Sequence, residues 1–233
     1  TMLRLHRPTG GRVTFEGQTI FDMGQKQWLP GSRMSDLRKD MQMIFQDPYG
    51  SLNPRLTVGQ AVEEGVARHH VVPPAERRAY CEAMLESCGL KKKFYMAYPH
   101  EFSGGQRQRI VIARALALKP KFVVCDEPTA ALDVSIQSQI LNLMMDLREE
   151  LNLTYLFISH NLRVTRAFCD EIVVMYLGKI VEQGPAEEVC SHPVHPYTRA
   201  LIDSLPVSNP WETRTKAQIL GSIPSAVHIP GGC

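Results

Sequence analysis

The stretch Phe122-Val123-Val124-Cys125-Asp126-Glu127 places two carboxylates directly after four apolar residues. A short apolar run of this kind indicates a buried strand, which holds the residues after it rigidly. Asp126 could therefore hold Mg²⁺, directly or through water, and Glu127 could polarise an attacking water. The alternative is an acidic strand end that only meets solvent. Because parallel sheets place ligands at strand ends, the stretch favours an α/β fold with a site at this edge.

About twenty positions earlier, Ser103-Gly104-Gly105-Gln106 stands where a helix is expected to begin and to continue through Leu118. Ser103 is a suitable N-cap, and the first amides of a helix together with its dipole form an anion site. Gly104 and Gly105 have no side chains, so the backbone can approach a phosphate, while Gln106 adds a polar arm. A glycine pair alone is more often a flexible turn, but its place at a helix start favours phosphate binding.

The remaining elements are expected to alternate between strands and helices, which predicts a mostly parallel sheet. Residues 1–5 resemble the last turns of a helix, and residues from Pro185 onward resemble an extended tail. Residues 57–70 and 74–89 have helical spacing and form a helical insertion. The other predictions are a hairpin at 12–15 and 18–21, helices at 35–39, 135–151 and 161–168, and strands at 41–45, 122–125, 154–158, 171–176 and 179–183.

Three further polar residues follow or precede predicted elements. Gln46, after the strand at 41–45, could ligate a metal or position water through its carbonyl, or could be an exposed loop residue. His160 follows the strand at 154–158 and could donate a hydrogen bond to a terminal phosphate, although a lone histidine is usually structural. Asp133 could contact nucleotide, could be the N-cap of the helix that follows, or could do both.

Composition limits the possible functions. Apolar residues make up 44% and charged residues 21% of the 233 residues, which is typical of a globular protein. The net charge of +2, with scattered basic residues, gives no reason to expect a nucleic acid as partner. Six cysteines without a Cys-x-x-Cys pair favour reduced thiols in the cytosol. Because no apolar stretch is long enough to span a membrane, we expect any membrane role to be peripheral.

Taken in order, these motifs resemble those of the ATP-binding subunits of ABC transporters. The matching residues are a glutamine loop at Gln46, the signature at Ser103–Gln106, the pair Asp126 and Glu127, an Asp loop at Asp133 and a switch histidine at His160. More narrowly, the segments at 45–48, 51–55 and 195–201 look like the oligopeptide and dipeptide importer branch. The resemblance covers nearly the whole chain.

This resemblance implies a P-loop NTPase fold of the ABC ATPase type, with a mostly parallel sheet, an antiparallel hairpin region and a helical subdomain. The implied domains are a RecA-like ATPase core at 1–56 and 119–190, a helical signature subdomain at 57–118 and a peptide-importer-type tail at 191–233. The implied catalytic residues are Glu127, His160 and Gln46, and the implied metal ligands are Asp126 and Gln46. Ser103, Gly104, Gly105, Gln106 and Asp133 would bind nucleotide.

The family also implies cofactors and partners. ATP and Mg²⁺ would lie between two ATP-binding subunits, either two copies or paralogues, so Ser103 and Gly105 would mainly serve the nucleotide of the opposite subunit. Transmembrane permease subunits would contact the loop after Gln46, a substrate-binding protein would act indirectly, and no nucleic acid would take part. The protein would lie at the cytoplasmic face of the cell membrane, where it would energise import of peptides or a related small solute.

Two features depart from the family pattern. The phosphate loop Gly-x-x-x-x-Gly-Lys-Ser/Thr does not occur, since the Gly-Lys pair at Gly178 is followed by Ile180. We therefore expect a chain truncated at both ends that is inactive as an ATPase on its own. An iron–sulfur cluster is expected only if the full-length chain continues past Cys233, because one cysteine cannot hold a cluster.

Two other functions remain as alternatives. The first is a non-catalytic partner or scaffold subunit of the same fold that does not turn over ATP, although a scaffold has no need of Asp126, Glu127 and His160 together. The second is an ABC ATPase of DNA repair or translation. DNA-repair members carry long coiled-coil insertions, and the segment at 57–100 is too short for one.

Overall fold

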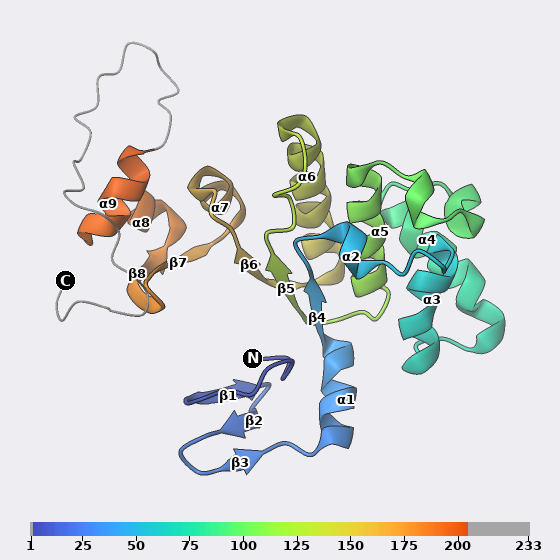
Figure 1. Ribbon diagram of the computed structural model, residues 1–233, viewed down its shortest axis with the longest axis horizontal. Helices are drawn as coiled ribbons and strands as arrows, with labels where there is room; N and C mark the ends of the chain where they lie inside the picture. Colours follow the sequence, from blue (N-terminus) through green and yellow to red (C-terminus); the bar gives the residue numbers. More distant parts are fainter. Residues whose placement is uncertain (1, 205–233) are drawn as a thin grey trace. The chain divides into compact units, whose positions relative to one another are not determined.

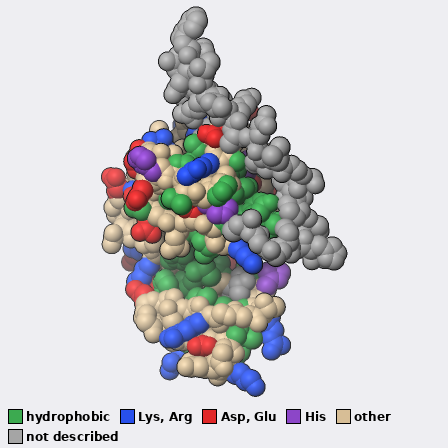
Figure 2. Space-filling model, turned by 90° about the vertical axis from the view of Figure 1, so that its left-hand side faces the viewer, with side chains coloured by type: hydrophobic (Ala, Val, Ile, Leu, Met, Phe, Trp, Pro, Cys, Tyr) green, Lys and Arg blue, Asp and Glu red, His purple; other side chains and the backbone are tan. Residues whose placement is uncertain are grey.

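The computed structural model describes residues 2–204. The chain divides into two compact units, one ending at Ile158 and the other beginning at Ser159. Side chains of both charges and apolar side chains are interspersed on the face shown in Figure 2. Within the described residues, no helix combines the length and the apolar character that crossing a membrane requires.

The first unit begins with a small antiparallel sheet, in which β2 pairs with both of its neighbours. Glu16 and Gly17, both with positive φ, form the tight turn between the first two strands. This sheet packs its apolar side chains, including Ile20 and Phe21, against Met34 and Met41. The strands are β1 (Arg12–Phe15), β2 (Gln18–Asp22) and β3 (Gln27–Trp28).

The prediction of a helix before this sheet is wrong. Residues 2–6 form a turn followed by bends. Arg4 has a φ of 56°, which a right-handed helix does not allow. Its guanidinium donates a hydrogen bond to the carbonyl of Leu29 and lies over the ring of Trp28. Contacts with the small sheet therefore determine the conformation of this segment.

A three-stranded parallel sheet forms the centre of the first unit, in the order β4-β5-β6 (Figure 1). The middle strand β5 is buried at Val123, Val124 and Cys125, in agreement with its apolar sequence. Parallel pairing brings the carboxyl ends of all three strands to one edge. The elements are α1 (Gly31–Asp40), β4 (Met41–Ile44), β5 (Phe122–Asp126), α6 (Val134–Leu151) and β6 (Thr154–Ile158).

The segment between β4 and β5 is helical, as predicted. Val58, Val62 and Val66, spaced four residues apart, form the buried face of α3. Helix α5 contacts α3, α4 and strand β4, and so links the helices to the sheet (Figure 1). The elements are α2 (Pro48–Ser51), α3 (Val58–Arg68), η1 (Pro74–Glu76), α4 (Arg77–Ser87), η2 (Lys92–Met96), η3 (Pro99–Glu101) and α5 (Gly104–Leu116).

The second unit contains a hairpin formed by the two strands predicted at 171–176 and 179–183. Strands β7 and β8 pair antiparallel with each other. Leu177 and Gly178, both with positive φ, form the turn, and two residues are too few for a parallel crossover. The elements are α7 (Leu162–Phe168), β7 (Glu171–Tyr176), β8 (Lys179–Pro185), α8 (Ala186–Ser191) and α9 (Pro196–Asp203).

The prediction of an extended tail is wrong where the structure describes it. Helix α8 follows Pro185, and α9 begins at Pro196 with the His195 side chain accepting a hydrogen bond from the Tyr197 amide. Proline is favourable at the first position of a helix, because its missing N–H would have no partner there. The part of the predicted tail from residue 205 onward lies outside the described residues.

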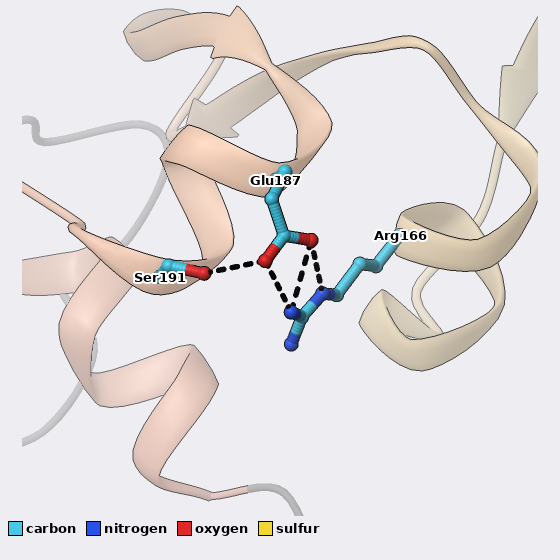
Figure 3. A network of polar contacts seen from close by, with 3 residues as sticks. All are labelled: Arg166, Glu187 and Ser191. Carbon is cyan, nitrogen blue, oxygen red and sulfur yellow. Dashed lines mark hydrogen bonds and ion pairs between the residues drawn. The ribbon is translucent and has the colours of Figure 1, made fainter.

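An exposed ion pair links two helices of the second unit. Arg166 of α7 donates to both carboxylate oxygens of Glu187 in α8, and Ser191 donates to one of them (Figure 3). The hydrogen bond from Arg166, followed by that from Ser191, lowers the pKa of Glu187 below its ordinary value. Because both charged groups are exposed, this pair defines geometry more than it adds stability.

Candidate active site

The carboxyl end of β5 carries the two predicted acidic residues. Asp126 is the last residue of the strand and is paired in register with Ile158 of β6. Glu127 follows with a φ of 44°, which is unusual for a residue other than glycine. Its amide donates to the Ile158 carbonyl at 3.0 Å, and its carbonyl accepts from the Ala130 amide at 3.1 Å. The backbone of Glu127 is therefore held on both sides in a strained conformation, of the kind that clusters at functional sites.

Gln46 reaches the same edge from the neighbouring strand, because β4 ends two residues before it and runs parallel to β5. Its side-chain nitrogen Nε2 donates to Oε2 of Glu127 at 2.9 Å. The structure thus brings together two predicted residues that lie 81 positions apart in the sequence. This bond uses the amide nitrogen of Gln46 and leaves its carbonyl oxygen for another ligand.

The donor atoms at this edge suit Mg²⁺. Asp126 and Glu127 offer carboxylate oxygens and Gln46 offers an amide oxygen, all of them hard ligands. The described residues contain no cluster of three or more His, Cys, Asp or Glu side chains that could hold a metal ion. Mg²⁺ requires no such cluster, since it commonly binds one or two carboxylates and takes its other oxygens from water and phosphate.

The helix start at Ser103 is built by a local exchange of hydrogen bonds. The Gln106 amide donates to Ser103 Oγ at 3.4 Å, and the Ser103 amide donates to Gln106 Oε1 at 3.0 Å. This capping box confirms Ser103 as the N-cap of α5. Helix geometry leaves the amides of Gly104 and Gly105 without an intrahelical acceptor, which suits an anion.

Gly105 also has a packing role that the sequence did not reveal. A Cβ atom on Gly105 would lie 2.5 Å from Cγ2 of Ile136 in α6, closer than atoms can approach. A Cβ on Gly104 would lie 3.4 Å from a methyl group of Leu132, an ordinary contact. Gly105 therefore lets the start of α5 fit closely against α6.

Asp133 lies directly before a helix and His160 shortly after a strand, as the sequence predicts. Asp133 is the N-cap residue of α6, as predicted, although its side chain makes no capping hydrogen bond. The loop before α6 is instead held by Gln137, which donates to the carbonyls of Thr129 and Leu132. His160 is exposed at the beginning of the second unit, and its role stays a prediction.

Sequence reasoning missed one contact close to these residues. The guanidinium of Arg107, in the first turns of α5, lies 3.8 Å from the ring centroid of Tyr49, three residues after Gln46. A signal for the burial of Arg107 was present, because it lies three and four residues before the buried Ile110 and Val111 and so shares their helix face. No sequence pattern indicated its partner.

A parallel sheet with a Gln–Glu pair at its carboxyl edge, together with a glycine-bearing helix start, is typical of cassette-type nucleotide-binding proteins. The family model described as ABC transporter matches residues 1–130. A second model, described as Oligopeptide/dipeptide transporter, C-terminal region, matches residues 181–233. The chain belongs to the ABC transporter family of ATP-binding proteins, and the resemblance seen in its motifs is confirmed.

Within that family, its relatives include ATP-binding proteins of peptide transport. The chain is 45% identical to the di/tripeptide transport ATP-binding protein DppF of Pseudomonas aeruginosa, over 98% of this chain and 69% of that protein. It is 46% identical to the oligopeptide transport ATP-binding protein AppF of Bacillus subtilis and to the dipeptide transport ATP-binding protein DppF of Escherichia coli. These two matches cover 100% of this chain and 70% and 67% of the relatives.

Solved structures confirm the predicted fold class. CbiO1 of Clostridium perfringens, part of the ABC transporter complex CbiONQ, superposes with a TM-score of 0.71 at 29% identity, covering 82% of this chain and 72% of CbiO1. The ATP-binding cassette MJ0796, in a dimeric post-hydrolysis state bound to ADP and Pi, gives a TM-score of 0.65 at 29% identity. That match covers 78% of this chain and 76% of MJ0796.

Proposed function

We propose that this protein is the ATP-binding and ATP-hydrolysing subunit of an ABC transporter that imports peptides or a related small solute. The observation that carries the proposal is the hydrogen bond between Gln46 and Glu127 at the carboxyl ends of adjacent parallel strands. The assignment to peptides is supported by the printed functions of the relatives and by the match of residues 181–233 to a peptide-transporter region.

In this proposal each residue has a distinct task. Asp126 and the carbonyl oxygen of Gln46 hold Mg²⁺, which when bound neutralises phosphate charge. Glu127 orients the attacking water and accepts a hydrogen bond from it. The amide nitrogen of Gln46 keeps the Glu127 carboxylate in place, and the strained Glu127 backbone fixes the direction of its side chain. His160 donates a hydrogen bond to the terminal phosphate.

The nucleotide is bound between two subunits. Ser103, Gly104, Gly105, Gln106 and Asp133 serve the ATP held mainly by a second ATP-binding subunit. The dimeric state of MJ0796 supports this arrangement, as does the exposure of Ser103 and Asp133. Transmembrane permease subunits contact the loop after Gln46, and a substrate-binding protein delivers the solute. The subunit lies at the cytoplasmic face of the membrane.

The functional domains follow the same proposal. Residues 1–56 and 119–190 belong to a RecA-like core, residues 57–118 form the helical signature subdomain, and residues 191–233 form the peptide-importer-type tail. The position of α3, α4 and α5 between β4 and β5 supports the second of these. Cys233, where an iron–sulfur cluster is expected only if the full-length chain continues past it, lies outside the described residues.

Replacing Glu127 by glutamine tests the catalytic assignment. Glu127→Gln keeps the size of the side chain but cannot activate water, so ATP turnover of the full-length protein should fall by a factor of about 10² or more. ATP should then trap a dimer, detected by light scattering. Glu149→Gln, at an exposed glutamate of α6, is the matched control and should keep wild-type turnover. Unchanged turnover in Glu127→Gln would remove Glu127 from the mechanism.

Titrating ATP onto the 233-residue chain tests the requirement for a phosphate loop. No Gly-x-x-x-x-Gly-Lys-Ser/Thr motif occurs among these residues, so we propose that this chain binds ATP very weakly or not at all and is inactive alone. Calorimetry should therefore show no saturable binding. Micromolar affinity would contradict this. If the full-length protein with its partners showed no turnover at all, the non-catalytic scaffold would become the better explanation.

A further inference from the structure

Arg107 is a buried cation, and its hydrogen bonds satisfy only part of its guanidinium. It lies in the first turns of α5 and is 7% exposed. Its Nε donates to the Pro99 carbonyl at 2.7 Å, and its Nη2 donates to the His100 carbonyl at 3.2 Å. Its Nη1 is buried and has no hydrogen-bond partner. A buried charge with an unpaired donor is costly, so some other group must stabilise the guanidinium.

The aromatic ring of Tyr49 is that group. The ring centroid lies 3.8 Å from Cζ of Arg107, so the guanidinium faces the π-electrons of the ring. Such contacts are strongest where the cation is shielded from water, as Arg107 is. Tyr49 itself is 65% exposed and belongs to a helix of only four residues. Its position therefore depends on the arginine beneath it more than on burial of its own side chain.

The segment that carries Tyr49 directly follows Gln46 and is closed by local hydrogen bonds. Asp47 accepts hydrogen bonds from the amides of Tyr49 at 2.8 Å and Gly50 at 3.1 Å, which closes the first turn of α2. The carbonyl of Ser51 accepts a hydrogen bond from Arg114, which is a second contact between α5 and this segment, beside the one between Arg107 and Tyr49. Two arginines of α5 thus hold the segment that begins at Gln46.

We propose that Arg107 and Tyr49 are positioning residues that join the helix starting at Ser103 to the Gln46–Glu127 pair. Arg107 is four residues after Ser103, and Tyr49 is three residues after Gln46. A displacement of the start of α5 therefore moves α2, and with it the amide that holds Glu127. The inference rests on the proposed roles of Gln46 and Glu127. It adds that the signature helix controls their geometry from within the same subunit.

A pair of substitutions at Tyr49 tests the Arg107–Tyr49 contact directly, because this exposed side chain can be changed with little effect on the core. Tyr49→Phe keeps the ring face, whereas Tyr49→Leu removes it. Amide hydrogen exchange of residues 47–52 should become about tenfold faster in Tyr49→Leu and stay at the wild-type rate in Tyr49→Phe. Equal exchange in all three proteins would show that the ring does not hold this segment, and would overturn the proposal.

Steady-state kinetics of the full-length protein, assembled with its membrane subunits, test the positioning role. Tyr49→Leu should lower kcat for ATP hydrolysis about threefold or more with KM changed by less than about twofold, because the ring orients a catalytic group and does not bind nucleotide. Tyr49→Phe should keep kcat at the wild-type value. A raised KM with unchanged kcat would instead place Tyr49 in nucleotide binding. Faster exchange with unchanged kcat would make the contact purely structural.

Arg109→Met is the matched control. Arg109 lies two residues further along α5 and donates to the Cys88 carbonyl at the end of α4, away from α2. Its replacement should leave the amide exchange of residues 47–52 and kcat unaltered. If Arg109→Met instead showed faster exchange and lower kcat, any disturbance of α5 would produce these effects, and the Arg107–Tyr49 contact would have no special role. A failure of the positioning proposal can be distinguished from a failure of the proposed function. If Glu127→Gln kept turnover, the proposed function would fail, whereas the exchange result would still report on the Arg107–Tyr49 contact.

Discussion

The sheet edge at Glu127 and the helix start at Ser103 represent the two halves of the proposed nucleotide site, and they are constructed differently. At the sheet edge, groups from three strands converge: Gln46 after β4, Glu127 after β5 and the carbonyl of Ile158 at the end of β6. At the helix start, Ser103 and Gln106 bond to each other across three residues. One site is assembled by the fold, and the other by a local motif.

This difference determines what a substitution should affect. The sheet edge contains a strained backbone at Glu127 and a side-chain contact over a long sequence separation, so it is held in place at some cost in stability. The helix start contains a satisfied capping box and a close fit to α6, so it contributes stability. A preformed, exposed helix start is also suited to a ligand held by another subunit, in agreement with the proposed function.

The largest stability effect is expected at Gly105. Gly105→Ala places a Cβ about 2.5 Å from Cγ2 of Ile136, whose β-branched side chain has little rotamer freedom in a helix. Relief of this clash requires α5 and α6 to separate, which should cost about 1–3 kcal/mol of unfolding free energy. Gly104→Ala meets only an ordinary contact at 3.4 Å and should be within about 0.5 kcal/mol of wild type. Urea unfolding measures both, and equal losses would show that the two glycines are equivalent in packing.

The sequence could predict those parts of the molecule that follow local rules. Ser103 with Gln106 three residues later is a capping-box pattern, and the structure confirms the helix start. The apolar run before Asp126 predicted the central strand, because a fully buried strand requires apolar side chains on both faces. Gln46 and Glu127 were each expected directly after a strand, but no pattern indicated that they would bond to each other.

The parts that could not be predicted depend on tertiary contacts or on ambiguous residues. The left-handed conformation of Arg4 follows from packing on the first sheet, which no local pattern encodes. Pro185 and Pro196 are typical of an extended tail, yet proline before or at the first turn also favours a helix. The pairing of Arg107 with Tyr49 joins residues 58 positions apart and has no sequence signature.

A smaller loss of unfolding free energy is expected at the N-caps, and it should differ between Ser103 and Asp133, which look equivalent in sequence. Ser103→Ala removes the side-chain acceptor for the Gln106 amide and should cost about 1 kcal/mol of unfolding free energy. Asp133→Ala removes a side chain that makes no capping bond and should cost at most about 0.5 kcal/mol, through loss of charge at a helix start. Denaturant unfolding at equal ionic strength compares them. A larger loss for Asp133→Ala would mean that Asp133, not Ser103, is the more important cap.

The smallest difference in unfolding free energy is expected between two substitutions of Glu127. Its sign reports directly on the strain of the backbone at this position. Glu127→Ala and Glu127→Gly both remove the carboxylate and its bond to Gln46, so both should abolish ATP turnover of the full-length protein. They differ only in the backbone. At an ordinary position glycine is less stable than alanine, because it loses more conformational entropy on folding. At a φ of 44° alanine pays a steric cost of about 1–2 kcal/mol that glycine avoids.

The sign of the difference should therefore reverse, with Glu127→Gly more stable than Glu127→Ala by about 0.5 kcal/mol in urea unfolding. Asp146, an exposed residue within α6, provides the control pair, because its backbone is helical and Asp146→Gly should be less stable than Asp146→Ala by about 1 kcal/mol. If alanine were also the more stable residue at position 127, the left-handed backbone would not be strained in the native protein. The sheet edge would then differ from the helix start only because its contacts join residues far apart in the sequence. It would not hold a residue in an unfavourable backbone conformation.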